Sequence, residues 1–100
     1  MNQPQPQPPQ PQQVQLKFDD AVIKGVYANL VQVNHTKEEF IFDFINMFPP
    51  VATLNARIIL SPGHVKRLSG LLNNLMKQYE DAHGSIEPSA EPSGIGFETK

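Results

Sequence analysis

The sequence predicts an α+β fold: a small antiparallel β-meander of three to four strands, followed by one long C-terminal amphipathic helix. Three observations predict it. Residues 14–60 contain short apolar segments, several of which alternate in the two-residue period of a strand. Residues 61–83 carry apolar side chains three and four positions apart, which is the spacing of one helix face. Short polar links join the expected strands, so neighbouring strands should pair antiparallel.

The folded part is expected to be a single domain over residues 14–84. Residues 1–13 contain six Gln, five Pro and no charged side chain, which predicts a disordered Pro/Gln-rich leader. Residues 85–100 are rich in Ser, Pro, Gly and Glu and predict a disordered tail. Whether the leader, or the tail at Ile95–Phe97, serves as a docking motif stays open. A domain of roughly 70 residues forms a core worth only a few kcal/mol, unless a staple or a partner supports it.

Strands are expected where apolar residues alternate or cluster between turn residues. Gly25 marks a bend before the second expected strand, and the Pro49-Pro50 pair ends the third. The expected strands are residues 14–18, 26–33, 40–48 and 52–60.

The strand at 40–48 is apolar on both of its faces. An antiparallel sheet with one wet face alternates polar and apolar residues, so both faces of this sheet need a cover. If Val33 lies opposite Phe40, the two faces separate into an aromatic and an aliphatic set. The first set is Tyr27, Asn29, Val31 and Val33 with Phe40, Phe42, Phe44 and Phe48; the second is Val26, Ala28 and Leu30 with Ile41, Ile45 and Met47.

The helix over residues 61–83 is expected to supply one of these covers. Ser61 suits the N-cap, Pro62 the first helical position, and Gly84 the residue after the helix. The apolar stripe contains Val65, Leu68, Leu72, Leu75, Tyr79 and Ala82, widened by Leu71 and Met76. We expect this stripe on the aliphatic face, although the sequence leaves the choice of face open.

A second copy of the chain is the simplest cover for the other face. The sequence therefore predicts a homodimer. Its expected interface residues are Val31, Phe40, Phe42, Phe44 and Phe48.

Charge and composition argue against several classes of function. Residues 14–83 hold seven Lys or Arg and seven Asp or Glu. A nucleic-acid binder normally has a basic excess, and an anionic membrane attracts polybasic segments, so neither partner is expected. The chain has no Cys. No phosphate-binding loop or metal-ligand spacing is present, so no cofactor, metal or small-molecule substrate is expected. The N-terminus does not resemble a secretory signal, which predicts a cytoplasmic protein.

Asp43 is the most informative charged residue, because it interrupts an otherwise apolar strand. A buried carboxylate needs a partner. Arg57 on the next strand is the expected one, with Lys66 or Arg67 as substitutes, and the pair would fix the strand register. A catalytic carboxylate would want a second acid or a His beside it, and the sequence places none there. The chain is therefore not expected to be an enzyme.

The start of the helix offers a weak candidate for an anion site. The free N–H groups of a helix N-terminus favour anions. The residues concerned are Ser61, His64, Lys66 and Arg67. The simpler interpretation is ordinary helix capping beside two solvated basic residues.

Several segments together resemble a known prokaryotic family. They are Lys24-Gly25-Val26-Tyr27-Ala28-Asn29-Leu30, His35-Thr36-Lys37-Glu38-Glu39-Phe40, Asp43-Phe44, Arg57-Ile58-Ile59-Leu60-Ser61-Pro62 and His64-Val65-Lys66-Arg67-Leu68. Over residues 22–84 the chain resembles the family named domain of unknown function 3467. The resemblance implies a bacterial or archaeal cytoplasmic protein, and it supplies no activity, cofactor or catalytic residue.

The functional expectation is a small non-enzymatic module that associates with itself and with other proteins. The alternative is a chaperone-like binder of unfolded or exported polypeptides, acting through an exposed apolar sheet face. The outline of a small sheet followed by a long helix is loosely similar to the export chaperone SecB, at the level of the fold alone.

Overall fold

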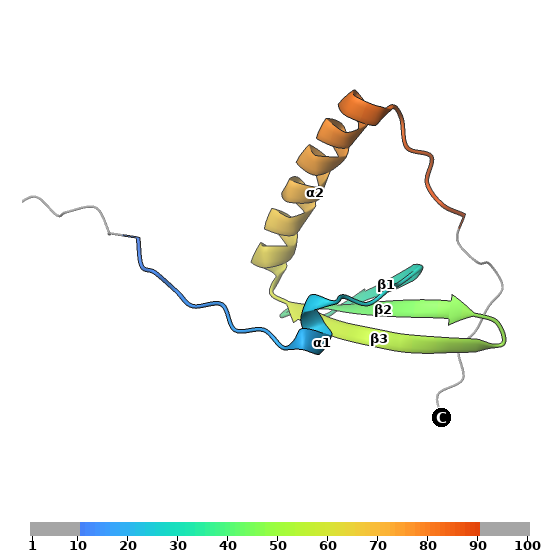
Figure 1. The fold of residues 1–100 in the computed structure, drawn as a ribbon, viewed down its shortest axis with the longest axis horizontal. Helices are drawn as coiled ribbons and strands as arrows, with labels where there is room; N and C mark the ends of the chain where they lie inside the picture. The colour runs from blue at the N-terminus through green and yellow to red at the C-terminus, as the bar shows by residue number, and fades with distance from the viewer. Residues whose placement is uncertain (1–10, 91–100) are drawn as a thin grey trace, which may run out of the picture.

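The computed structural model of the chain describes residues 11–90. Its elements follow the order α1 (Asp20–Ile23), β1 (Leu30–His35), β2 (Phe40–Phe48), β3 (Val51–Leu60) and α2 (Pro62–His83), as Figure 1 shows. The protein is thus an α+β fold with one sheet and one long C-terminal helix, as the sequence predicted. Residues 11–13 and 84–90 are in neither helix nor strand, and the rest of the predicted leader and tail, with Ile95–Phe97, lies outside the described residues.

The three strands form one antiparallel meander in the order β1-β2-β3. Val33 pairs with Phe42 and His35 with Phe40, so β1 is shifted by two residues from the expected register. Side chains alternate with a period of two, so an even shift leaves the paired residues of β1 on their expected faces; the expected face residues at 26–29 precede β1 and belong to no strand. Thr36 closes the turn between β1 and β2, where its Oγ1 accepts hydrogen bonds from the backbone N–H groups of Glu38 and Glu39 at 3.1 and 3.2 Å.

The second hairpin contains the Pro49-Pro50 pair, whose peptide bond is cis. This pair ends β2 as expected. A β-bulge interrupts the β2–β3 ladder, because Phe44 pairs with Ala56 while Ile45 pairs with Leu54. The residue left over on β3 is Asn55.

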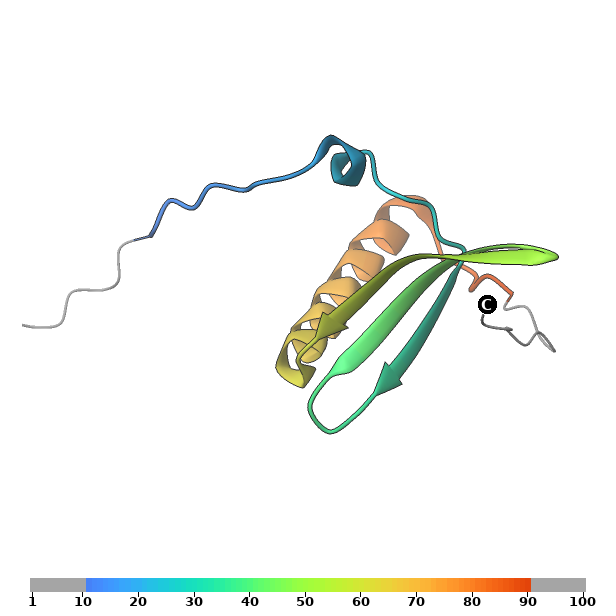
Figure 2. The same ribbon diagram turned by 90° about the horizontal axis from the view of Figure 1, so that it is seen from below.

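The predicted first strand over residues 14–18 is wrong. These residues are exposed and belong to no strand, and α1 follows them as a single helical turn. In Figure 2 this part of the chain runs away from the sheet. Alternation marks residues that can lie on a half-buried sheet, but a strand also needs an adjacent edge to pair with. Gly25 has a φ of +77°, a left-handed conformation that favours glycine, and it turns the chain toward β1.

Helix α2 begins and ends as the sequence predicted. The Ser61 hydroxyl accepts a hydrogen bond from the His64 backbone N–H at 3.3 Å, and Pro62 is the first helical residue. Gly84 follows the helix with a φ of +95°, and its N–H donates to the Glu80 carbonyl at 2.8 Å.

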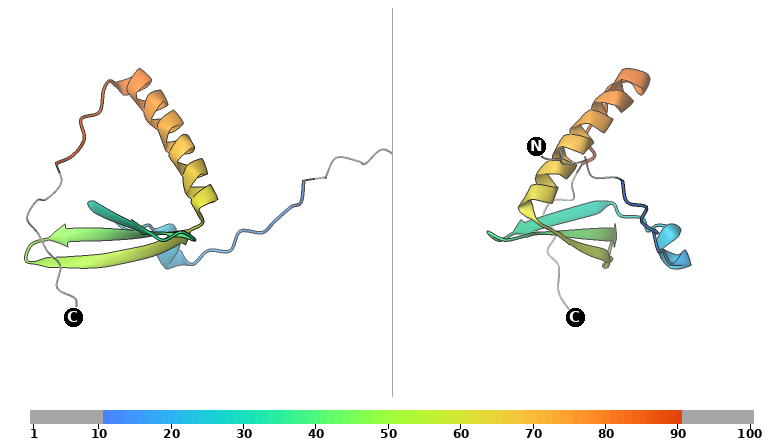
Figure 3. Two further views of the ribbon diagram at one scale, coloured as in Figure 1. Left: turned by 180° about the vertical axis from the view of Figure 1, so that it is seen from behind. Right: turned by 90° about the vertical axis from the view of Figure 1, so that its left-hand side faces the viewer.

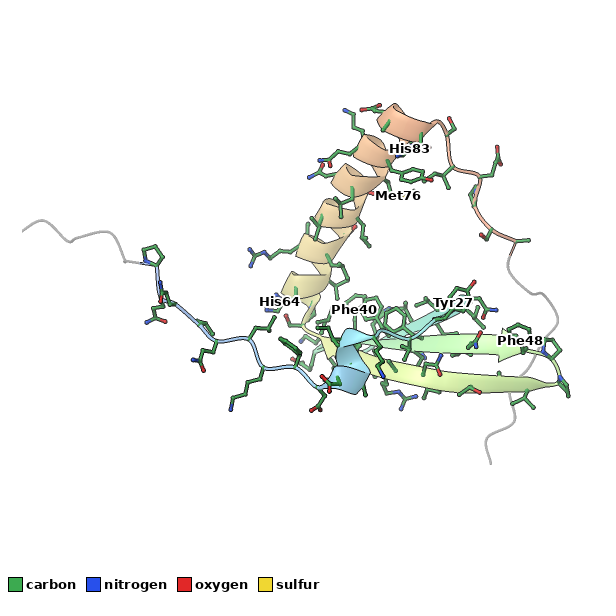
Figure 4. The ribbon with its side chains drawn as sticks, in the orientation of Figure 1. Tyr27, Phe40, Phe48, His64, Met76 and His83 are labelled. Carbon is green, nitrogen blue, oxygen red and sulfur yellow. The ribbon has the colours of Figure 1, made fainter. Side chains whose placement is uncertain are left out.

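The expected packing of α2 on the aliphatic face is wrong. Ser61 alone separates β3 from α2, and the helix then diverges from the sheet, as Figures 1 and 3 show from several directions. It rises on the side of the sheet on which Phe40 and Phe48 lie in Figure 4, which is the aromatic side. The amphipathic pattern requires an apolar surface to cover the stripe, but it does not require that surface to belong to the same chain.

Candidate functional site

One face of the sheet is apolar apart from His35 and the Asn46–Thr53 pair, and we call it the aromatic face. Its members project to the same side of the three paired strands: Val31, Val33, Phe40, Phe42, Phe44, Phe48, Val51 and Ile58. The rings of Phe42 and Phe44 are nearly parallel, with centroids 6.4 Å apart, and the His35 ring stacks on Phe40 at 5.2 Å. Side chains at the edges of this face are about half exposed or more, as with Val33 at 47% and Phe48 at 71%.

The second apolar surface is the helix stripe, formed by Val65, Leu68, Leu71, Leu72, Leu75, Met76 and Tyr79 of α2. Val65 and Leu68, in the first two turns, are half-buried. Farther from the sheet the stripe opens to solvent, and Leu72 and Tyr79 are about half exposed. Figure 4 shows Met76 on the side of α2 that is turned toward the sheet. The helix stripe and the aromatic face therefore lie on the same side of the sheet, but they do not pack against each other.

The described residues contain almost no buried core. Ile45, at 7% exposure, is the one buried apolar side chain between residues 11 and 90, and Asp43, at 8%, is the one buried polar side chain. Both project from β2 on the face opposite the aromatic face, which follows from their alternation with Phe42 and Phe44. Folding of a single copy thus removes little apolar surface from water.

Asp43 and Arg57 lie directly opposite each other on β2 and β3. The Arg57 guanidinium donates two hydrogen bonds to the Asp43 carboxylate, from Nε to Oδ1 at 2.7 Å and from the terminal nitrogen to Oδ2 at 2.9 Å. The hydrogen bonds from Arg57 hold the pKa of Asp43 below its ordinary value, and Asp43 raises the pKa of Arg57 in return. Because both carboxylate oxygens accept from one guanidinium, the pair is suited to fixing the register of β2 and β3.

The two members of this ion pair differ in exposure. The Asp43 side chain is 12% exposed, whereas that of Arg57 is 57% exposed. The guanidinium therefore lies over the carboxylate and closes it off from water, and the pair is open to solvent on its Arg57 side.

The candidate anion site at the start of α2 has the geometry of a helix cap. The Ser61 hydroxyl already accepts the His64 N–H, and the side chains of His64, Lys66 and Arg67 are exposed on the first turns. Residues 11–90 contain no group of three or more side chains able to hold a metal ion. No helix in this part of the chain is long and apolar enough to cross a membrane.

Two asparagines position the chain before β1, a role that was not predicted from the sequence. The side-chain amide of Asn29 takes the place of a backbone partner for Met47. The Met47 N–H donates to Asn29 Oδ1 at 2.7 Å, and Asn29 Nδ2 donates to the Met47 carbonyl at 3.0 Å. Asn55, the bulge residue, donates from Nδ2 to the Tyr27 carbonyl at 2.6 Å. The signal in the sequence is an Asn within an apolar segment at each place. These contacts hold residues 27–29 to the sheet, where the sequence analysis expected strand pairing.

A family model described as "Protein of unknown function (DUF3467)" matches residues 1–88. The chain belongs to the DUF3467 family. The match includes the expected span of 22–84 and extends to residue 1. No curated protein and no solved structure matches this DUF3467 protein.

Proposed function

We propose that this DUF3467 protein is a small, non-enzymatic interaction module that acts as a homodimer in the cytoplasm of a bacterial cell. One observation carries the proposal: the aromatic face and the helix stripe are both exposed to solvent, while a single apolar side chain is buried in the part of the chain that the structure describes. The expected interface residues Val31, Phe40, Phe42, Phe44 and Phe48 all lie on the aromatic face. Association is the route by which this surface leaves water.

The size of these surfaces supports association. Ten of the exposed apolar residues, five on each surface, present together about 1,000 Å² per copy, at roughly 100 Å² for each half-exposed large side chain. A standard interface covers about 800 Å² per partner. At roughly 25 cal/mol per Å², the gain from burial before the costs of association exceeds the usual 5–15 kcal/mol of total stability. The residues that supply this area are Val31, Val33, Phe48, Val51, Ile58, Leu71, Leu72, Leu75, Met76 and Tyr79.

Light scattering on the purified chain tests the proposal directly. At micromolar concentration we expect twice the 11.2 kDa chain mass. Phe44→Asp, which places a charge on the aromatic face, should give a monomer or an unfolded chain, as should Leu75→Asp on the helix stripe. A well-folded wild-type monomer would contradict the proposal.

Matched control variants distinguish the effect of the substituted position from the effect of the added negative charge. Asn34→Asp adds the same charge on β1 but opposite Ile41, on the other face of the sheet. Asn73→Asp adds the same single charge at an exposed residue of α2 outside the helix stripe. Both variants should keep the wild-type mass. Loss of the dimer in both controls would show that net charge, and not either surface, governs association.

A second candidate, a chaperone-like binder of unfolded polypeptides, is favoured by the exposure of apolar side chains on two separate elements. A dye that fluoresces on apolar surfaces distinguishes it from the dimer. A closed dimer hides both surfaces and leaves the dye dark, whereas a chaperone displays them in the folded state. Bright dye on the folded protein, together with suppressed aggregation of a denatured client, would favour the chaperone.

A further inference from the structure

We propose that the dimer is helix-exchanged: α2 of each copy lies along the aromatic face of the other. This inference rests on the proposed self-association and names the surfaces that meet. Its starting point is the joint at Ser61, which places α2 on the aromatic side of its own sheet but directs it away from that sheet. A helix in this position cannot bury its stripe on its own strands beyond the first two turns.

The dimensions of the two surfaces agree. The 22 residues of α2 span about 33 Å at 1.5 Å per residue. The nine residues of β2, the central strand, span about 30 Å at roughly 3.3 Å per residue. The helix stripe, from Val65 to Tyr79, takes up about 21 Å of the length of α2, so one stripe covers roughly two-thirds of the length of the aromatic face.

The chemistry of the two surfaces agrees as well. Neither the aromatic face nor the helix stripe includes a charged residue, so their contact desolvates no ion. The charged residues of α2 lie outside the stripe, at Lys66, Arg67, Lys77, Glu80 and Asp81. The opposite face of the sheet carries the Asp43–Arg57 pair at its centre, and an apolar helix placed there would have to cover a charge. The aromatic face is thus the better of the two faces for the stripe.

Symmetry doubles the contact. In a two-fold dimer, the stripe of the first copy meets the aromatic face of the second, and the reverse contact follows by the same operation. Each copy then buries both of its exposed surfaces, so the full area of about 1,000 Å² per copy leaves water. A dimer formed by the aromatic faces alone would leave both helices in solvent, and a dimer formed by the helices alone would leave both sheets exposed.

Cross-linking between two differently tagged copies tests this arrangement. The chain has no cysteine, so an introduced thiol is unique. We would co-express Leu75→Cys with one tag and Val33→Cys with a tag of different mass, confirm folding by circular dichroism, and add a short bismaleimide. The three possible dimer bands differ in mass, and the mixed band, Leu75→Cys joined to Val33→Cys, should dominate.

The controls and the contrary outcomes are distinct. Replacing Val33→Cys by Gln32→Cys moves the thiol to the other sheet face, and replacing Leu75→Cys by Lys77→Cys moves it off the stripe; each should lower the mixed band several-fold. Predominant same-tag dimers, or a dimer with no mixed band, would overturn helix exchange while the proposed self-association stands. A chain carrying both thiols that links only to itself would also overturn it. A monomer by light scattering would reject self-association itself.

Discussion

The most direct consequence of the small buried core between residues 11 and 90 is that thermal stability should depend on protein concentration. A monomer has the same melting temperature at every dilution, whereas a folded dimer that unfolds to separate chains loses stability by mass action when it is diluted. The perturbation is therefore dilution itself, which requires no mutation.

The magnitude follows from the size of the folded part. Asp20 to His83 encloses all the helices and strands of the described residues, and two such spans unfold with an enthalpy of about 90 kcal/mol near 60 °C. With that enthalpy, each tenfold dilution lowers the melting temperature of a dimer by about 6 °C. Between 100 and 1 μM, on the order of the concentrations that circular dichroism allows, the total change should be about 12 °C.

Far-ultraviolet circular dichroism at matched heating rates gives the melting temperatures, and light scattering at the same concentrations gives the mass. Asn34→Asp should show the wild-type dependence, whereas Phe44→Asp should lose it or fail to fold. A wild-type melting temperature that stays constant within about 1 °C over this range, with a mass of one chain, would refute the reasoning. It would mean that the exposed aromatic face is compatible with a stable single copy.

Four other perturbations act within one copy. Asp43 has a lowered pKa in the folded state, so its pairing stabilises the fold above its unfolded pKa of about 3.9, and this contribution is lost as the pH falls through the folded value. The free energy of unfolding of the wild type, measured by urea titration, should therefore fall on acidification below about pH 4. Arg57→Gln should flatten that dependence on pH. Arg57→Ala should destabilise more than Asp43→Ala, because it leaves the less exposed partner unpaired. Equal losses would argue against this asymmetry. Ile45→Ala should cost about 2–5 kcal/mol of unfolding free energy by urea titration, and Ile45→Val about 0.5–1.5 kcal/mol; equal effects would show that Ile45 is not packed. Asn29→Ala removes two hydrogen bonds to Met47 and should cost about 1–2 kcal/mol, with faster hydrogen exchange at the Met47 amide; unchanged exchange would show that the contact is weak.

Local features of the fold were predictable from the sequence because short-range chemistry determines them. The bounds of β2 and the cap at Ser61 follow from residue type and position. The pairing of Asp43 with Arg57 follows from a carboxylate in an apolar strand with one basic residue on the next. The composition of each sheet face survived an error of two residues in the register, because two is the period of a strand.

What the sequence analysis missed depends on the path of the chain in space. An alternating pattern at 14–18 does not establish that an edge lies beside it. The stripe on α2 establishes that the helix needs an apolar partner, but the direction in which the helix leaves Ser61 decides whether its own sheet can be that partner. Asn29 was expected in a strand because its neighbours in the sequence are apolar. Its side-chain amide takes the place of a backbone pair, and such a contact leaves no periodic signal in the sequence.

Because Ser61 alone joins β3 to α2, the direction in which each side chain of α2 points around the helix axis is fixed relative to the two faces of the sheet. Successive helical residues are turned by about 100° around the helix axis. One residue inserted into the first turn of α2 would rotate everything after it by that angle and carry Leu72 and Leu75 away from the aromatic side. Four inserted residues, at about 400°, would bring them back to within roughly 40° of their original direction. The length of this joint therefore sets the direction in which the helix stripe faces relative to the sheet, so the number of residues between β3 and α2 is constrained as well as their types.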